Sequence, residues 1–573
     1  MIKKLISLID INKSVPLLFI LICIGAFIEL LSFSSLIPVV YFFVSKSDNQ
    51  ILLYIEDLVK ILFLNYNFEI EIKLIIIISI LIIFFIKFLY ILFLTFFQSN
   101  YTADLEIKLK KFFLINYIKN SNKKIKNTDT ATLIRNIQNE VSIFIKSVFY
   151  PVLTIILELL ILCFSIVGLL IYNFRSTLIL VIIFAALSAI YFITFKKRFH
   201  YWGKIRQFHV ARQFSTIIES LNLSKLINIY DIKYFFIKKF NYHLNEHKKI
   251  TIKNSLFIIF PRIFLEFFFI LLISLISIFY LLSGNHLDDL FTLLLVYIII
   301  ASRLFPAITR IAASFQSIST GKASVNVLFN EKKIFENLSD KNKIKKISFN
   351  KNIKFENLNI SILDEKKKIN KIILENSSFK ISKNEFIGLI GRSGVGKTTL
   401  INYLLGFASA EKSNVFVDGN KLKKSAYLNF SKIGVVTQEP LIFNGTIKDN
   451  LYFKENVTID KIKLDKVIEI TNLKEFIKQS KLGLETLISE KGKNISGGQI
   501  QQICIARALI FEPKILILDE ATSALDLETE NKILSSLKKI RDLTCIIISH
   551  RKETLISCDK IYQIDNKKII LKK

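Results

Sequence analysis

Six long apolar segments in the first three hundred positions constrain this chain more than any other feature of its sequence. Each has about the length that a helix needs to cross a bilayer, roughly 20 residues. They are residues 15–43, 72–97, 148–172, 178–195, 256–282 and 290–308, and none of this kind follows. The first 328 residues are therefore predicted to form a polytopic α-helical membrane domain with six spans.

The composition requires a water-facing part as well. Of the 573 residues, 52% are hydrophobic, yet 22% are charged and the formal net charge is +31. A bilayer interior cannot hold so many charges. The hydrophobicity excludes intrinsic disorder, and the five cysteines lack the CxxC or zinc-type spacings of a disulfide-built or metal-built domain.

Lys and Arg concentrate in two of the loops between spans. The loop between spans two and three and the loop between spans four and five are strongly basic, whereas the loop before span six contains Asp288 and Asp289. Basic loops stay in the cytoplasm, so both termini are predicted to be cytoplasmic. The two basic loops keep a helical pattern, which indicates helices that continue beyond the bilayer and reverse near residues 127–136 and 219–231.

Ionisable residues within spans are costly and become functional candidates. They are Glu29, Lys87, Glu158, Arg262, Glu266, Arg303 and Arg310. Arg262, Glu266, Arg303, Arg310 and Lys87 are the candidates for a polar substrate cavity. Two alternatives stay open: Arg262 and Glu266, spaced i,i+4, can neutralise one another, and Lys87 and Arg310 can snorkel from span ends. Residues 51–64 fit a short interfacial helix or an extension of a span.

A soluble domain is predicted over residues 347–573, after a charged linker at 329–346. In it, the apolar strand 386–390 runs into a glycine-rich loop of the form GxxxxGK[ST], which binds phosphate through backbone N–H groups at a helix N-terminus. Lys397 would reach the terminal phosphates of ATP, and the Thr398 hydroxyl would ligate Mg²⁺. The residues of this loop that we expect to bind ATP are Gly391, Ser393, Gly394, Gly396, Lys397, Thr398 and Thr399.

A second motif follows the apolar strand 514–518. It ends in Asp519 and Glu520, two adjacent carboxylates. Asp519 suits coordination of Mg²⁺, and Glu520 is placed to polarise an attacking water. Together with the phosphate loop, the pair predicts an α/β P-loop ATPase cassette.

Further motifs identify a family. Residues 495–499, Ile-Ser-Gly-Gly-Gln, are similar to the signature of the ATP-binding-cassette (ABC) superfamily. Residues 436–440 resemble its Q-loop, residues 523–526 its D-loop, and residues 549–551 its switch histidine. Six motifs agree in order and spacing over about 200 residues, so the domain resembles an ABC nucleotide-binding domain.

The resemblance implies the roles of individual residues. Glu520, His550 and Gln438 would be catalytic, and Thr398, Gln438 and Asp519 would hold Mg²⁺. In this family two cassettes sandwich two ATP molecules, so the signature turn would complete the site of a second copy, through Ser496, Gly497, Gly498 and Gln499. One cassette and six spans are half the usual complement, which predicts a homodimer.

Two departures from the family pattern are visible. Ile362 occupies the position of the aromatic residue that stacks on adenine, which weakens the expected contact with the base. Ile500, Gln501 and Gln502 follow the signature where the family commonly has a basic residue and then Gln-Arg.

The whole chain resembles the type IV ABC exporter fold, in which short helices at 127–136 and 219–231 would dock on the cassette. Residues 261–266 and 302–310 are similar to segments of flippases of lipid-linked oligosaccharides. We therefore expect an ATP-driven flippase of the inner membrane, which moves a lipid-linked oligosaccharide or similar anionic glycolipid to the outer leaflet. The alternatives are an exporter of peptides, drugs or phospholipids, and a non-transport ABC ATPase or a channel. Six spans argue against a nucleic-acid partner.

Overall fold

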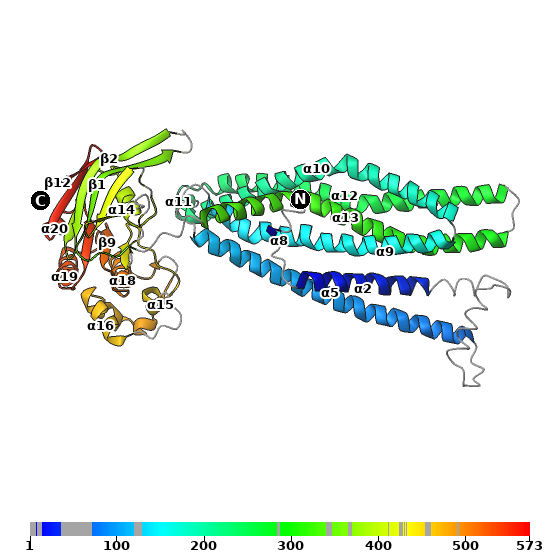
Figure 1. The fold of residues 1–573 in the computed structure, drawn as a ribbon, viewed down its shortest axis with the longest axis horizontal. Coiled ribbons are helices and arrows are strands. Elements are labelled where there is room, and N and C mark those ends of the chain that lie inside the picture. The colour runs from blue at the N-terminus through cyan, green and yellow to red at the C-terminus, as the bar shows by residue number, and fades with distance from the viewer. Residues whose placement is uncertain are drawn as a thin grey trace. The chain divides into compact units, whose positions relative to one another are not determined.

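The structure is a computed structural model. It describes residues 7–8, 14–35, 72–119, 129–172, 174–282, 287–339, 347–364, 369–408, 410, 412–422, 428, 430, 432–452, 460–489 and 492–573. The chain divides into two compact units, Met1–Asp340 and Lys341–Lys573 (Figure 1). The predicted interfacial helix at 51–64 lies outside the described residues.

The described residues of the first unit include six long helices. They are α2 (Ser14–Ser34), α5 (Ile72–Lys119), α9 (Tyr150–Tyr172), α10 (Phe174–Asn222), α12 (Lys233–Leu282) and α13 (Leu287–Ser339). Helices α10, α12 and α13 have 49, 50 and 53 residues, and at 1.5 Å per residue each exceeds the bilayer core of about 30 Å. Helix α13 continues to Ser339, so the first part of the segment assigned to a linker is helical.

Length and composition make several of these helices able to cross a membrane. Within the described residues, four helical stretches qualify, at Val15–Ser32, Ile77–Lys119, Thr130–Phe164 and Lys233–Leu275. The third includes a run of short elements that leads into α9: α7 (Thr130–Arg135), the π-helix η2 (Asn136–Glu140), α8 (Val141–Phe144) and the π-helix η3 (Ile145–Phe149).

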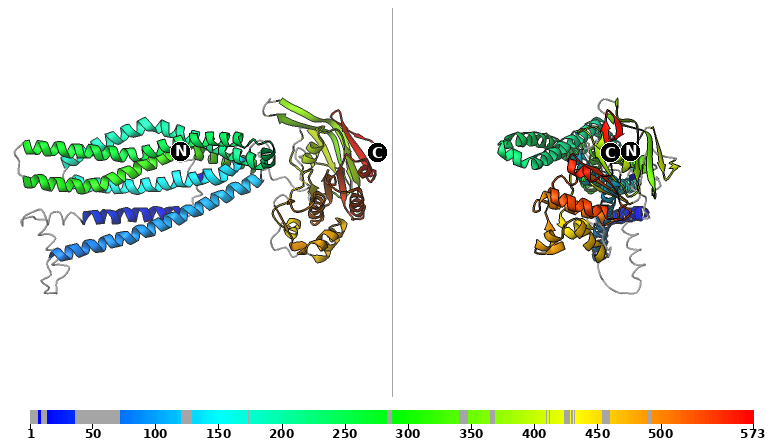
Figure 2. Two further views of the ribbon diagram at one scale, coloured as in Figure 1. Left: turned by 180° about the vertical axis from the view of Figure 1, so that it is seen from behind. Right: turned by 90° about the vertical axis from the view of Figure 1, so that its left-hand side faces the viewer.

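Close helix packing holds this unit together. Helix α13 packs against α9, α10 and α12, and α2 packs against α5 and α9 (Figures 1 and 2). At Gly203 in α10, a Cβ atom would lie 2.3 Å from the carbonyl oxygen of Thr320 in α13, so only glycine permits this approach. Between α10 and α12 the chain reverses through the short helix α11 (Ser224–Ile229), inside the predicted reversal at 219–231.

The cassette is built on a six-stranded sheet with the order β12-β11-β3-β10-β9-β6. Its strands are β3 (Phe386–Ile390), β6 (Ile433–Val436), β9 (Ile515–Asp519), β10 (Thr544–Ile548), β11 (Lys560–Asp565) and β12 (Lys568–Leu571). Every residue of β9 and β10 is buried, as expected for parallel strands covered on both faces. Because β6, β9, β10 and β3 are parallel, the loops that follow them meet at one edge of the sheet.

A second sheet of antiparallel strands packs on this one, with the order β2-β1-β4-β5. Its strands are β1 (Asn352–Asp364), β2 (Ile369–Ser382), β4 (Lys412–Val417) and β5 (Asn420–Lys421). Phe355 stacks on Phe379 with ring centroids 4.3 Å apart, within a core that includes residues of both sheets.

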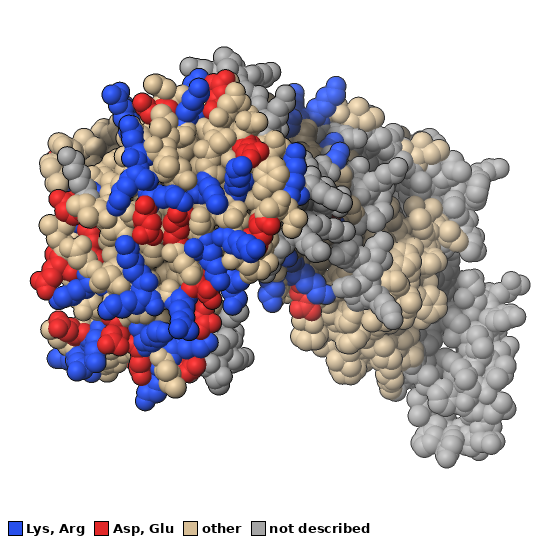
Figure 3. Space-filling view, turned by 60° about the vertical axis from the view of Figure 1, so that its left-hand side comes forward, with Lys and Arg blue, Asp and Glu red and all other residues tan. Residues whose placement is uncertain are grey.

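Helices and short strands complete the cassette. They are α14 (Lys397–Leu404), β7 (Gly445–Thr446), α15 (Ile447–Leu451), α16 (Lys461–Ile470), α17 (Lys474–Gln479), η4 (Gly483–Glu485), β8 (Leu487–Ile488), α18 (Gly497–Leu509), α19 (Leu527–Lys538) and α20 (Lys552–Ile556). Lys and Arg are interspersed with Asp and Glu over the face of the cassette drawn in Figure 3.

Candidate functional site

The glycine-rich loop joins β3 to α14, the strand–loop–helix arrangement predicted from the sequence. Gly396 has a φ of +116°, and a Cβ atom there would lie 2.4 Å from Cγ2 of Ile373. Both the backbone conformation and the space exclude a side chain at this position. Glycine therefore brings the loop backbone against β2.

Lys397 is the first residue of α14, directly after this loop. Its Nζ atom donates hydrogen bonds to the carbonyl oxygens of Gly391 at 2.6 Å and Arg392 at 3.2 Å. Burial lowers the pKa of Lys397, and the nearby carboxylates of Glu520 and Asp519 oppose that shift. A buried ammonium group beside a glycine-rich loop at a helix N-terminus suits a polyanion.

The other predicted phosphate-binding residues lie in the loop and in the first turn of α14. Ser393 and Gly394 are exposed in the loop, and Thr398 and Thr399 belong to the first turn of α14. The Thr398 side chain is exposed, so its hydroxyl is accessible. The loop, the lysine and the positive end of α14 thus fit a nucleotide phosphate chain.

Asp519 is the last residue of β9 and is only 8% exposed. Burial raises the pKa of Asp519, and the charge of Glu520 raises it further, while Lys397 acts in the opposite direction. Because burial disfavours the charged form of this carboxylate, a nearby cation would stabilise that form. Oxygen ligands from Asp519 and Thr398 fit Mg²⁺.

Glu520 has an unusual backbone conformation, with φ of +52°. Left-handed conformations cost a non-glycine residue about 1–3 kcal/mol and persist where the surroundings impose them. Here the N–H of Glu520 donates to the carbonyl oxygen of Ile548, at the end of the neighbouring strand β10, at 3.1 Å. This bond holds the turn at the carboxyl end of β9.

The three predicted catalytic residues come together at this edge. Gln438 Nε2 donates to one carboxylate oxygen of Glu520 at 2.8 Å, and His550 Nε2 lies 3.2 Å from the other oxygen. Each residue follows a different parallel strand, β6, β9 or β10. Residues up to 112 positions apart in sequence thus meet because the ends of parallel strands share one edge.

The predicted signature residues form the start of α18. Ser496 is the N-cap: its hydroxyl accepts from the Gln499 N–H at 3.2 Å, and the Gln499 side chain accepts from the Ser496 N–H at 2.9 Å. Ser496 and Gly497 are exposed. The positive end of α18 therefore faces solvent, where an anion of another molecule could reach it.

Two residues that depart from the family pattern have definite places. Gln502 is buried and donates to the carbonyl oxygen of Asn472 at 3.4 Å. Gln501, which matches the Gln of the pattern, is buried beside residues 523–524. Ile362 lies in β1, opposite Lys371 of β2.

The ionisable residues of the membrane unit form ion pairs. Lys87 lies 3.8 Å from Glu29, and Arg262 donates to Glu266 at 2.7 Å, which is the i,i+4 pairing that the spacing had suggested. Arg310 donates from two nitrogens to both oxygens of Glu158, the second at 3.2 Å. Arg303 belongs to α13, and its side chain lies outside the described ones.

Two buried ion pairs, one in the membrane unit and one in the cassette, are not predicted by the sequence analysis. Glu158, which is 3% exposed, binds Arg310 across 152 positions, and Glu530, which is 1% exposed, binds Arg551. A signal for Glu530 exists, because it shares one face of α19 with buried Ile533, Leu534 and Leu537. A carboxylate at a core-facing position of an amphipathic helix requires a buried partner.

Comparison with known proteins agrees with this geometry. The family model described as "ABC transporter" matches residues 374–523. An export ATP-binding/permease protein of Rickettsia typhi is 42% identical over 200 residues, which are 35% of this chain and 34% of that protein. An ATP-dependent lipid A-core flippase of Wigglesworthia glossinidia brevipalpis is 33% identical over 388 residues, which are 65% of this chain and 64% of that protein. The chain thus spans less than two thirds of either relative.

A solved structure resembles the whole chain. It is that of a bacterial Atm1-family ABC exporter with ATP bound, with a TM-score of 0.78, 18% sequence identity and coverage of 97% of this chain and 94% of that one. Residues 374–523 are an ABC transporter ATPase domain, and the chain has the fold of an ABC exporter. The predicted fold, apolar helices followed by an ABC cassette, is confirmed.

Proposed function

We propose that this chain, which carries an ABC transporter domain and has an ABC exporter fold, is an ATP-driven membrane translocase. The observation that carries the proposal is Glu520, held at one edge of the sheet by Gln438 and His550. The phosphate loop with Lys397 lies at the end of β3 at the same edge. Such a site can bind ATP and activate water beside it.

The residues divide the chemistry between them. Lys397 and the loop N–H groups would bind the phosphates, and the Thr398 hydroxyl, the Asp519 carboxylate and the amide oxygen of Gln438 would hold Mg²⁺. Bound Mg²⁺ neutralises charge on phosphate oxygens. Glu520 would accept a proton from the attacking water, and His550 would keep its carboxylate oriented.

The proposed working unit is a homodimer in the cytoplasmic membrane, with both termini and the cassette on the cytoplasmic side. The exposed signature turn at Ser496 and Gly497 supports the dimer, and the basic loops support the orientation. In such a dimer the signature turn of one copy completes the phosphate site of the other.

Complementation tests the shared site. Copies that carry Lys397→Ala and copies that carry Ser496→Arg should each be inactive alone. In mixed dimers one site would combine both changes and the other would be intact, so co-expression should restore ATP hydrolysis. A mixture as inactive as either variant would mean that each site is formed within one copy.

The proposed substrate is an anionic glycolipid of the lipid-linked oligosaccharide or lipid A-core type. The flippase relative supports a lipid substrate. The ion pairs bear on which basic residues can bind an anionic substrate, because Lys87, Arg262 and Arg310 are each paired with a carboxylate. Arg303, whose side chain lies outside the described ones, stays the candidate from the sequence for contact with an anionic head group.

Reconstitution of the full chain in proteoliposomes tests the function. Lipid-linked oligosaccharides, lipid A-core glycolipid, phospholipids and peptides would be offered in parallel, with Glu520→Gln as the matched control. ATP-dependent movement of glycolipids, absent from Glu520→Gln, is expected. Movement of peptides or phospholipids alone would favour the alternative exporters. ATP hydrolysis without movement of any compound would favour a non-transport ATPase, and ion conductance a channel.

A second measurement tests the substrate path separately from ATP hydrolysis. Arg303→Ala should abolish glycolipid movement while basal ATP hydrolysis continues. Movement equal to that of the unchanged protein would remove Arg303 from the substrate path.

A further inference from the structure

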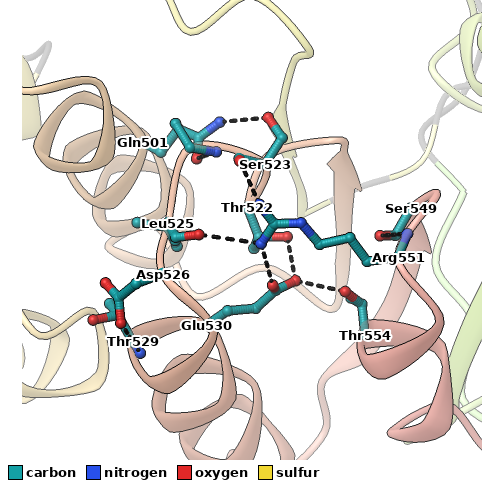
Figure 4. Close-up of polar contacts among 11 residues, drawn as sticks. Gln501, Thr522, Ser523, Leu525, Asp526, Thr529, Glu530, Ser549, Arg551 and Thr554 are labelled. Carbon is teal, nitrogen blue, oxygen red and sulfur yellow. Dashed lines mark hydrogen bonds and ion pairs between the residues drawn. The ribbon is translucent and has the colours of Figure 1, made fainter.

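A buried carboxylate links three segments of the cassette. Glu530 in α19 is 1% exposed. One of its oxygens accepts hydrogen bonds from the hydroxyls of Thr522 and Thr554, both at 2.7 Å, and the other accepts from Arg551 Nη1 at 2.9 Å (Figure 4). A buried charge persists only when it is paired and hydrogen-bonded. Glu530 therefore fixes the segment after β9, the segment after β10 and α20 relative to one another.

Arg551 extends this link to the backbone of residues 523–526. Its Nη2 donates to the Ser523 carbonyl oxygen at 2.7 Å, and its Nη1 also donates to the Leu525 carbonyl oxygen at 3.1 Å (Figure 4). Arg551 directly follows His550, and Ser523 lies three residues after Glu520. The guanidinium group thus clamps together the two loops whose side chains meet 3.2 Å apart at Glu520 and His550.

Gln501 holds the same segment from the side of α18. Its Nε2 donates to the Ser523 hydroxyl at 3.2 Å, and its Oε1 accepts from the Ala524 N–H at 2.9 Å. The first turn of α18 lies close by, because a Cβ atom on Gly498 would be 3.3 Å from the carbonyl oxygen of Ala524. Residues 523–526 are therefore fastened between the signature helix and Arg551.

We propose that Gln501, Arg551 and Glu530 are positioning residues for ATP hydrolysis, and that they couple the signature helix to the Glu520–His550 pair through residues 523–526. This inference rests on the proposed ATPase function. Side chains bind the carbonyl groups of Ser523 and Leu525 and the N–H group of Ala524. The backbone path of residues 523–526 therefore depends on those side chains. A displacement of about 1 Å at a reacting group can lower turnover about 100-fold.

The test compares kcat and KM for ATP in the full chain. Gln501→Ala removes both bonds, whereas Ser523→Ala removes only the hydroxyl that accepts from Gln501 Nε2 and leaves the bond to the Ala524 N–H. We expect kcat to fall about tenfold or more in Gln501→Ala, less in Ser523→Ala, with KM within about twofold of the unchanged protein. Arg551→Lys keeps the charge without the planar fork and should behave like Gln501→Ala.

Matched controls separate this inference from other effects. Glu528→Gln alters an exposed residue of α19 whose partner is Lys532, and it should leave kcat and KM unchanged. Unchanged kcat in Gln501→Ala would overturn the positioning role, as would equal losses in Gln501→Ala and Ser523→Ala. Hydrolysis that survives in Glu520→Gln would instead overturn the assignment of Glu520, so the two failures are distinguishable.

Discussion

Gln438 donates a 2.8 Å hydrogen bond from its side-chain nitrogen to a carboxylate oxygen of Glu520. The other oxygen of Glu520 faces His550 Nε2 at 3.2 Å. The amide group of Gln438 has an oxygen as well as a nitrogen, so it can hold Glu520 and offer an oxygen to Mg²⁺ at the same time. One side chain can thereby join the metal site to the residue that activates water.

The Gln438–Glu520 contact predicts which substitution of Gln438 lowers kcat more. Gln438→Ala removes a hydrogen bond to a charged group, worth about 1.5–3 kcal/mol, so kcat should fall about tenfold or more. Gln438→Glu places a second carboxylate against Glu520 and should lower kcat further, because like charges at this distance repel. Steady-state ATP hydrolysis at pH 7.5 measures both. Equal kcat in the two variants would show that the contact is not made during turnover.

The buried ammonium of Lys397 predicts how ATP binding depends on pH. Burial lowers the pKa of Lys397 below its usual 10.5, and phosphates bind the protonated form. ATP affinity should therefore be constant near neutral pH and fall as the pH rises through the lowered pKa, before 10.5 is reached. Binding of a fluorescent ATP analogue to full-length Glu520→Gln, from pH 7 to 10, measures this.

The control for that titration is the double variant Glu520→Gln/Lys397→Ala. It should bind the analogue weakly and without the alkaline decline. A decline of the same size in both proteins would assign the pH dependence to another group.

The close approach at Gly396 predicts a severe effect from one added methyl group. In Gly396→Ala the new Cβ would lie 2.4 Å from Ile373 in a φ of +116°, so the phosphate loop must shift and ATP binding should be lost. Gly394→Ala is the comparison, since its φ of +76° is also unfavourable for alanine but nothing lies within 4 Å. Equal ATP affinity in the two variants would contradict the role of the contact with Ile373.

The Glu158–Arg310 pair predicts a stability effect in the membrane unit. Arg310→Ala would leave Glu158, which is 3% exposed, without its partner and should cost about 3 kcal/mol. The double variant Glu158→Leu/Arg310→Met removes both charges and should recover most of that loss. Thermal unfolding of the full chain in detergent measures this.

Arg262→Ala serves as the control in the same unfolding experiment. Arg262 belongs to the more exposed pair with Glu266, which lies within one helix, so its loss should shift the unfolding temperature much less than Arg310→Ala does. If Arg310→Ala unfolds at the same temperature as Arg262→Ala, the Glu158–Arg310 pair does not stabilise the helices.

Local sequence patterns predict much of this structure. Apolar segments long enough to cross a bilayer indicate helices wherever they occur, and the six long helices of the described residues contain most of the six apolar segments. The third segment begins in η3, and residues 36–43 of the first lie outside the described residues. The phosphate loop, the paired carboxylates and the signature turn need only neighbours in sequence, so their spacing alone predicts the cassette and most of its site.

Contacts between distant residues depend on the tertiary structure. Spacing cannot show that Arg310 binds Glu158 rather than a free head group, that Gln438 binds Glu520, or that Arg551 and Gln501 clamp the segment beside Glu520. Those contacts arise when parallel strands end at one edge and long helices pack against one another. Sequence alone shows which chemical groups are present and on which elements they lie. Packing sets which of these groups meet, because a buried charged side chain is stable only beside a partner that the fold brings within reach.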